Sequence, residues 1–274
     1  MISIIIPSRS AVALAAISEN IAKTIGVPFE IIDYDNTEDG FGICKIYNLC
    51  AQKAQFDTLV FCHDDLLFES ENWGVHLCKI LGDKNVGLVG VAGATFKSKY
   101  PAPWVAVPQE FYRCQLTNKF PLNAKDYEEV AVLDGCFIAM RAEVWREFLW
   151  NENQLKGFHL YDIDMSTRVF ANYKLVVART FKLKHLSAGK FDTNWYQESK
   201  AYFDKNSKLF PTQVDKIDRK YINYLDAYAL KSLIFRRDTI KLSNFEVLNY
   251  ISKIFSKYPK ILNKGFLRYI IRIS

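Results

Sequence analysis

The sequence predicts an α/β protein with a doubly wound, mostly parallel central sheet and helices on both of its faces. Three apolar segments, 2–6, 29–34 and 59–62, alternate with two segments of helical spacing, 11–25 and 42–55. This β-α-β-α-β alternation is typical of a parallel sheet with right-handed crossovers. Each predicted strand ends in polar residues, so these polar ends should gather at one edge of the sheet.

Turn-forming residues set the limits of the first elements. The β-branched segment 2–6 suits a buried strand and stops at a short polar loop. Ala, Leu and Ile recur at helical spacing over 11–25, and Gly26-Val27-Pro28 end that helix. The second strand, 29–34, runs into an acidic turn. No glycine-rich phosphate loop follows the first strand, which disfavours a standard dinucleotide-binding fold and a P-loop.

The third strand carries the most polar end. Its apolar run, 59–62, leads directly into His63, Asp64 and Asp65. Such a run suits a strand buried on both faces of a parallel sheet, and ligands bind beyond the carboxyl ends of such strands. Adjacent carboxylates stay ionised more readily beside a cation. The motif is therefore either a site for Mg²⁺ or Mn²⁺ with phosphates, or a polar turn after a core strand.

The rest of the first 195 residues alternates less regularly. We expect a helix at 71–81, a strand at 86–92, loops and a hairpin over 93–126, a strand over 129–140, a short helix from 141, a helix at 165–171 and a strand at 173–178. The strand over 129–140 is interrupted by Asp134-Gly135, which indicates a bulge or a close approach of the backbone to a ligand. The irregular segment 93–126 is long enough to shape an acceptor pocket.

Composition narrows the class of protein. With 274 residues, half of them hydrophobic, the chain can bury a sizeable core. The six cysteines form no C-x-x-C pair and most lie in apolar or helical patterns, which indicates free thiols in a reducing compartment. No apolar run reaches the ~18 residues of a membrane span. Because a strand rather than a signal peptide follows Met1, we expect a cytoplasmic protein.

Residues 213–274 differ in character from the rest. They are rich in Lys, Arg and Tyr at helical spacing, so we expect a domain at 1–212 and a helical extension at 213–274. Over 245–274, six basic residues alternate with apolar ones and face a single acid, Glu246. This basic amphipathic pattern predicts contact with an anionic membrane, or else a solvated face or dimer contact. The catalytic half shows no basic and aromatic stripe, so nucleic acid is not an expected partner.

Taken in order, these segments resemble the inverting family 2 glycosyltransferases, which use nucleotide sugars and have the GT-A fold. The resemblance covers residues 1–195. Ile2–Arg9 is similar to the family's first strand and loop, under the nucleotide. Glu30–Asn36 is similar to its second strand, whose terminal aspartate contacts the base. His63-Asp64-Asp65 stands at the D-x-D motif, with His63 in place of the first aspartate, as in one branch of the family.

The resemblance implies a role for each candidate residue. Contacts to the nucleotide or the sugar are expected from Pro7, Ser8, Arg9, Asp35, Asn48, Asp64, Asp65, Asp134 and Gly135. Asp65 and His185 are the expected ligands of Mn²⁺ or Mg²⁺. In Tyr161-Asp162-Ile163-Asp164, Asp162 carries over as the catalytic base, with Asp164 as the alternative and Tyr161 replacing a glutamate. Asp33 competes with Asp35, and His63 either binds the metal or orients Asp65.

Together these roles imply a metal-dependent inverting glycosyltransferase. A divalent cation stabilises the departing diphosphate, and a carboxylate deprotonates the acceptor hydroxyl. The expected donor is a nucleoside-diphosphate sugar, UDP-linked by analogy, and the acceptor a glycan or lipid-linked saccharide of polysaccharide biosynthesis. We expect the enzyme in the cytoplasm or at the inner face of the cell membrane. The alternatives are a nucleotidyltransferase on a similar sheet and a non-catalytic nucleotide- or sugar-binding module.

Overall fold

The computed structural model describes residues 1–116, 125–187, 189–261 and 266. The chain divides into two compact units. Unit 1 consists of Met1–Thr95 and Arg113–Ala188, and unit 2 of Phe96–Tyr112 and Gly189–Ser274. The division differs from the expected boundary at residue 212, because the segments before that residue and after 188 pack with the C-terminal helices. The roles assigned to 1–212 and 213–274 stay predictions.

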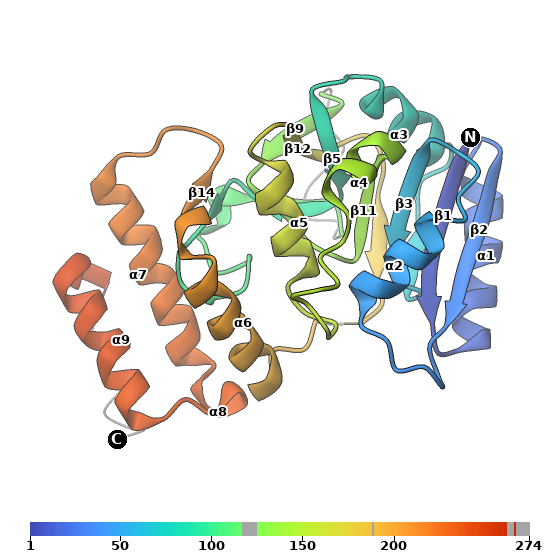
Figure 1. Cartoon of the computed structure of the whole chain (residues 1–274). Coiled ribbons are helices and arrows are strands. Elements are labelled where there is room, and N and C mark those ends of the chain that lie inside the picture. The colour runs from blue at the N-terminus through green and yellow to red at the C-terminus, as the bar shows by residue number, and fades with distance from the viewer. Residues whose placement is uncertain (117–124, 188, 262–265, 267–274) are drawn as a thin grey trace. The chain divides into compact units, whose positions relative to one another are not determined.

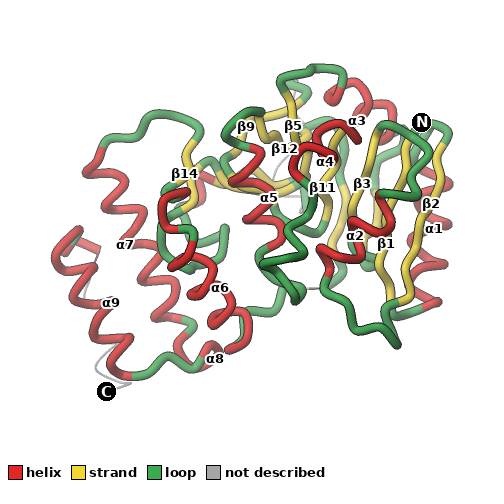
Figure 2. The backbone as a smooth tube through the Cα atoms, viewed as in Figure 1, coloured by secondary structure: helices red, strands yellow, loops and turns green. Residues whose placement is uncertain are grey.

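Unit 1 is built on a seven-stranded sheet (Figures 1 and 2). In spatial order its strands are β2 (Phe29–Asp35), β1 (Ile2–Ser8), β3 (Thr58–Cys62), β11 (Phe137–Arg141), β5 (Val86–Gly90), β12 (Lys174–Ala178) and β9 (Tyr127–Val130). β2, β1, β3, β5 and β12 run in one direction, whereas β11 and β9 run in the opposite direction. The expected mostly parallel α/β sheet is therefore confirmed, with one reversed strand near its centre.

Helices cover both faces of this sheet, as expected. They are α1 (Ala11–Thr24), α2 (Ile43–Ala51), α3 (Trp73–Leu81), α4 (Ala142–Phe148) and α5 (Tyr161–Val169). Because successive strand side chains point to opposite faces, Val60 packs in a core cluster with Ile21 of α1 and Leu77 of α3. Its neighbour Phe61 meets Tyr47 of α2 edge-on, with the ring centroids 5.0 Å apart.

The strand expected over 129–140 is wrong as a single element. After the edge strand β9, the chain forms β10 (Val132–Leu133), which pairs with β6 (Ala92–Ala94) outside the main sheet. It then enters the middle of the sheet as β11. The physical reason lies in the turn between them, where Asp134 Oδ1 accepts a hydrogen bond from the Cys136 N–H at 2.9 Å. This turn places Asp134 and Gly135 at the sheet edge that carries the predicted site.

The connection after β3 also matters for the site. His63, Asp64 and Asp65 form the turn between β3 and β4 (Leu66–Phe68). β4 pairs antiparallel with β13 (Leu183–His185), so that His185 lies opposite Leu66. Two segments more than a hundred residues apart are thereby held side by side.

Unit 2 is mainly helical. Its helices are α6 (Thr193–Lys205), α7 (Arg219–Phe235), α8 (Arg237–Ile240) and α9 (Asn244–Lys257), with short helical turns η1 (Gln109–Phe111), η2 (Ser207–Leu209) and η3 (Pro259–Ile261). β14 (Thr212–Gln213) pairs with β7 (Phe96–Lys97), and β8 (Tyr112–Cys114) crosses the boundary between the units. The expected C-terminal helices are confirmed for the described part of 213–274. Among the described residues, no helix is long and apolar enough to cross a membrane.

The basic amphipathic pattern of 245–274 is partly explained by packing within unit 2. Val247, Tyr250 and Ile254 of α9 are buried in a cluster with Leu230 and Leu233 of α7. The basic residues Lys264, Arg268 and Arg272 lie outside the described residues. The apolar positions of α9 thus serve first to attach this helix to α7.

Candidate active site

The carboxyl ends of β1, β2 and β3 meet at one edge of the sheet. Ser8 pairs with Asp35 in the parallel register of β1 and β2. The Ser8 hydroxyl donates a hydrogen bond to Asp64 Oδ2 at 2.6 Å. Three of the predicted donor-binding residues are thus brought together, as expected when parallel strands end at the same level.

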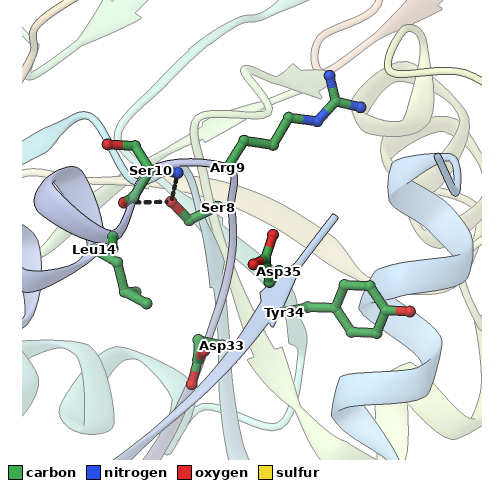
Figure 3. Close-up of a pocket in the computed structure, with 8 residues that line it drawn as sticks. Ser8, Arg9, Ser10, Leu14, Asp33, Tyr34 and Asp35 are labelled. Carbon is green, nitrogen blue, oxygen red and sulfur yellow. Dashed lines mark hydrogen bonds between the residues drawn. The ribbon is translucent and has the colours of Figure 1, made fainter. Parts of the chain in front are cut away.

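A pocket of about 190 Å³ lies between the loop after β1 and the end of β2 (Figure 3). Its lining residues are Ser8, Arg9, Ser10, Ala11, Leu14, Asp33, Tyr34 and Asp35. Pro7 of β1 is half-buried and lies opposite Tyr34 of β2, which lines the pocket. Figure 3 shows the Arg9 side chain extending away from Asp33, and its guanidinium lies 5.3 Å from the ring centroid of Phe158. Asp33 and Asp35 both line the pocket, so both remain candidates for the base contact.

Three side chains beside this pocket form a candidate metal site. His185 Nε2 lies 3.1 Å from Asp65 Oδ1 and 3.4 Å from His63 Nδ1, and the last two atoms are 3.9 Å apart. The point in the plane of these three atoms that is equidistant from them lies about 2.0 Å from each. Bonds between divalent metals and protein ligands have a similar length, about 2.0–2.2 Å. Asp65 Oδ1 is sealed from solvent and accepts no hydrogen bond from any described residue. These residues therefore fit a divalent cation.

Backbone pairing holds the candidate ligands in place. The His63 N–H donates to the Cys136 carbonyl at 3.0 Å, which fixes the turn after β3 to β11. The Leu186 N–H donates to the Asp65 carbonyl at 2.9 Å, which continues the pairing of β4 with β13. The short turn that carries His63 and Asp65 is thus held between paired strands, and His185 lies in the strand β13.

The hydrogen bonds of Tyr161 determine which ring nitrogen of His63 carries the proton. The Tyr161 hydroxyl lies 2.8 Å from His63 Nε2 and donates to the Gly135 carbonyl at 3.0 Å. Because a carbonyl only accepts, the single hydroxyl proton is directed to Gly135, and His63 Nε2 carries the proton that it donates to Tyr161. Nδ1 then bears the lone pair toward Asp65 and His185. His63 is therefore held in the tautomer that a metal ligand requires.

The protonation equilibria of the cluster suit metal binding. Burial raises the pKa of Asp65, but a hydrogen bond from Ser187 and the nearby imidazoles outweigh it and hold this pKa below its usual value. Burial, and then the neighbouring His185, lower the pKa of His63. Both shifts favour the forms that bind metals, an anionic carboxylate and a neutral imidazole.

Asp162 lies in the first turn of α5, close to the turn that holds Asp134 and Gly135. The helix begins at Tyr161 rather than at 165, after Leu160 in the left-handed region at φ 66°. Burial and then the Asp134 carboxylate raise the pKa of Asp162 to about 7, although backbone N–H groups that include Gly135 partly oppose the shift. A carboxylate with this pKa is suited to accept a proton near neutral pH.

Asp164, the alternative base, has different surroundings. It is buried, and its carboxylate accepts hydrogen bonds from Arg168 at 2.8 Å and from Asn151 at 3.2 Å. Both oxygens of this carboxylate are therefore engaged within the protein, by an ion pair with Arg168 and a hydrogen bond from Asn151. The structure thus gives Asp162 and Asp164 distinct environments, which the sequence spacing did not separate.

Asn48 is placed differently from the other predicted residues. It is buried, and its Oδ1 accepts from the Trp150 N–H and the Trp145 ring N–H, while Nδ2 donates to the Trp150 carbonyl. It does not line the pocket beside β1 and β2. Its polar atoms are engaged in holding the segment after α4, and a nucleotide contact for Asn48 has no support from this geometry.

The contacts of Tyr161 with His63 and Gly135 were not predicted from the sequence. A Cβ atom added at Gly135 would meet the Tyr161 hydroxyl at 2.3 Å, so a side chain at 135 would displace the group that orients His63. The one indication in the sequence is that Tyr161 stands where family 2 enzymes have a glutamate. The consequence of this replacement depends on a contact with His63, which is 98 residues away.

A family model and several solved structures are similar to this chain. The chain belongs to the family described as "Glycosyltransferase like family", whose model matches residues 5–208. No curated protein sequence matches the chain. Solved structures of low identity match the fold over nearly the whole chain, and they support the α/β architecture of the GT-A type.

Three of those structures show the extent of the likeness. GalNAc-T7 with UDP, GalNAc and Mn²⁺ has a TM-score of 0.54 at 13% identity, covering 94% of this chain and 58% of that chain. TarS from S. aureus has a TM-score of 0.53 at 12% identity, with 95% and 50% coverage. TarS 1–349 in complex with UDP-GlcNAc has a TM-score of 0.50 at 13% identity, with 92% and 81% coverage. The chain thus spans about half the length of the first two proteins.

Proposed function

We propose that this protein is a metal-dependent, inverting glycosyltransferase that transfers a sugar from a nucleoside-diphosphate sugar, UDP-linked in the first instance, to a hydroxyl of a glycan or lipid-linked acceptor. The observation that carries the proposal is the convergence of His63, Asp65 and His185 beside the pocket at the ends of β1 and β2. Family membership supports the transferase class. The presence of UDP and Mn²⁺ in the matched GalNAc-T7 structure supports the choice of donor and ion.

The donor nucleotide is assigned to the pocket of unit 1. Asp35 or Asp33 contacts the base, and the linked pair Ser8 and Asp64 contacts the ribose or the sugar. Arg9 is exposed at the mouth of the pocket, where its charge suits a diphosphate. Asp134 and Gly135 form the backbone behind the donor sugar. These assignments follow from placement and from the resemblance of the sequence to family 2 enzymes.

The divalent cation is assigned to Asp65, His185 and His63. When bound, the ion supplies positive charge for the departing diphosphate. Two imidazoles beside one carboxylate favour Mn²⁺ over Mg²⁺, because Mg²⁺ prefers oxygen ligands. Tyr161 keeps the His63 lone pair directed at the site.

Asp162 is assigned as the general base. It accepts the proton of the acceptor hydroxyl while the new glycosidic bond forms and the bond from the anomeric carbon to the diphosphate breaks. One base and no enzyme nucleophile give inversion at the anomeric carbon. The pKa of about 7 places Asp162 near the value at which a general base works best at neutral pH.

A donor screen tests this proposal. UDP, GDP and CMP are compared by thermal shift with and without Mn²⁺, and nucleotide release is then measured over a panel of nucleotide sugars. We expect stabilisation by one nucleoside diphosphate that depends on Mn²⁺, followed by release of that nucleotide, with an inverted anomeric centre in the product. Turnover of a nucleoside triphosphate with pyrophosphate release would favour a nucleotidyltransferase, and metal-dependent binding without turnover would favour a non-catalytic module.

We also propose that α9 contacts an anionic membrane. Phe245, Leu248 and Phe255 are 79%, 65% and 67% exposed, and their spacing places them on one face of the helix. Exposed Lys241 and Lys260 flank them. Large exposed apolar side chains next to lysines suit a membrane surface. Sedimentation with vesicles tests this: binding should require anionic lipid and be lost in Phe245→Ser/Phe255→Ser, whereas equal sedimentation of this variant would contradict the contact.

A further inference from the structure

A second pocket is built entirely from residues of unit 2. Its volume is about 340 Å³, at the small end of the range for ligand pockets. Tyr228, Lys231, Ser232 and Phe235 lie along one face of α7, Arg236 follows the helix, and Val105 and Tyr112 close the pocket from the segment 96–112. None of these residues belongs to the candidate active site.

Lys231 and Arg236 line this pocket, and neither has a carboxylate partner among the described residues. Arg236 donates to the Ser232 carbonyl and hydroxyl and lies 5.5 Å from the ring centroid of Phe191. The Lys231 Nζ lies 5.6 Å and 5.2 Å from the ring centroids of Phe235 and Phe266. No ion pair joins either cation to an acidic side chain of the described residues. The remaining residues of the chain, 117–124, 188, 262–265 and 267–274, include no Asp or Glu.

The charge of this pocket is therefore uncompensated. Burial alone lowers the pKa of Lys231, and burial also lowers that of Arg236, although Tyr112 and Tyr228 oppose the second shift. A partly buried cation without a counter-ion is destabilised, and an anion bound by both side chains would remove that penalty.

The helix dipole accounts for only one of these cations. Carbonyl groups at the end of a helix attract positive charge, and Arg236 follows α7 and binds the Ser232 carbonyl there. Lys231 lies more than one turn earlier and makes no hydrogen bond within the described residues. The carbonyl groups at the end of α7 therefore do not stabilise the charge of Lys231.

The side chains around the cations indicate the kind of molecule that carries the anion. Tyr112, Tyr228 and Phe235 provide aromatic rings, on which the apolar face of a sugar ring packs well. The Tyr228 hydroxyl adds a hydrogen-bonding group, whereas the Tyr112 hydroxyl donates to the Val105 carbonyl. We propose that this pocket binds the phosphate or carboxylate group of an anionic saccharide, with Lys231 and Arg236 as its cations. On the proposed function, which this step assumes, the ligand is the acceptor.

Direct binding measurements test the pocket without relying on transfer. Glucose 6-phosphate, glucuronate, inorganic phosphate and neutral glucose are titrated by calorimetry at low salt into wild type, Lys231→Gln and Lys231→Gln/Arg236→Gln. Lys220→Gln is the matched control, because Lys220 is an exposed lysine on the same helix. We expect both anionic sugars to bind more tightly than glucose or phosphate, at least 10-fold weaker binding in the double variant, and wild-type binding in the control.

The same variants separate this inference from the proposed function. UDP binding with Mn²⁺ should be unchanged in Lys231→Gln, since the donor pocket lies in unit 1. Equal binding of glucose and glucose 6-phosphate, or wild-type affinity in the double variant, would overturn the anion site. Inorganic phosphate binding as tightly as the sugar phosphate would overturn the saccharide assignment. Failure of UDP to bind while the anionic sugars still bind would reject the proposed function alone.

Discussion

The candidate active site of unit 1 and the pocket of unit 2 carry opposite charge. The edge of the sheet in unit 1 gathers Asp64, Asp65, Asp134 and Asp162, and one oxygen of Asp65 is sealed from water without a hydrogen bond. The pocket of unit 2 carries Lys231 and Arg236 and no acidic residue. Our proposals accordingly assign a cation to unit 1 and an anion to unit 2, and variants of the unit 1 residues test the first assignment.

The largest effect is expected from replacing the proposed base. Asp162→Asn should lower transfer by about 10³-fold, because a positioned general base contributes roughly 10²–10⁴-fold. Binding of UDP with Mn²⁺ should not change, since Asp162 is not among the metal ligands. Steady-state transfer and calorimetric UDP titration give the two values. Asp164→Asn is the comparison variant, and a larger loss of transfer there with intact UDP binding would reassign the base.

Removal of a metal ligand should have the next largest effect. Asp65→Ala or His185→Ala should weaken Mn²⁺-dependent UDP binding by about 10²-fold or more, because each removes one of three converging ligand atoms. Mn²⁺ titration followed by electron paramagnetic resonance reports the metal directly. Glu38→Ala serves as the control, because Glu38 is an exposed carboxylate outside both the pocket and the cluster. Unchanged Mn²⁺ affinity in both ligand variants would rule out this site.

A smaller effect is expected from the hydroxyl that orients His63. Tyr161→Phe should weaken Mn²⁺ binding by about 10-fold, since groups that orient a metal ligand typically contribute 10–100-fold. The change should be accompanied by a mixture of His63 tautomers in ¹⁵N NMR, whereas wild type should show the Nε2–H form. Gly135→Ala should act in the same way through displacement of the hydroxyl. A wild-type tautomer in Tyr161→Phe would show that the hydroxyl does not select it.

The smallest expected effect is on stability and its pH dependence. The pKa of Asp162 is raised in the folded protein to about 7 from its usual 3.8, so folding takes up a proton and stability falls as pH rises through that window. Asn does not ionise, and Asp162→Asn should therefore raise the melting temperature above pH 7 but not below pH 4 relative to wild type. Transfer by the wild type should rise with pH through about 7. Parallel melting curves at all pH values would contradict the raised pKa.

Hydrophobic periodicity was sufficient to predict the first half of unit 1. The β-α-β-α-β order and the polar strand ends determined that Ser8, Asp35 and Asp64 would meet, because parallel strands in register end together. The reversed strand β11 was not predicted. Its direction depends on β10 pairing with β6 outside the main sheet, and such pairing between distant segments leaves no periodic signal.

The limits were similar for the candidate site. The resemblance named Asp65 and His185, which the pairing of β4 with β13 brings together. The tautomer of His63 depends on a hydrogen-bond chain through Tyr161 to Gly135, which no local pattern encodes. Helical spacing did not reveal that the side chain of Asn48 turns toward Trp150, and its contact with a nucleotide stays a prediction. The unit 2 pocket combines an irregular segment with a helix more than a hundred residues away, and no local pattern indicates such a pocket.

The central claim is that the cluster of His63, Asp65 and His185 makes donor binding depend on a divalent cation. The most direct test is calorimetric titration of UDP into the wild-type protein and His185→Ala, each with Mn²⁺ and after chelation of all metal. We expect the wild type to bind UDP at least 10-fold more tightly with Mn²⁺, and His185→Ala to lose most of that difference. Equal UDP affinity of the wild type with and without metal would contradict the claim.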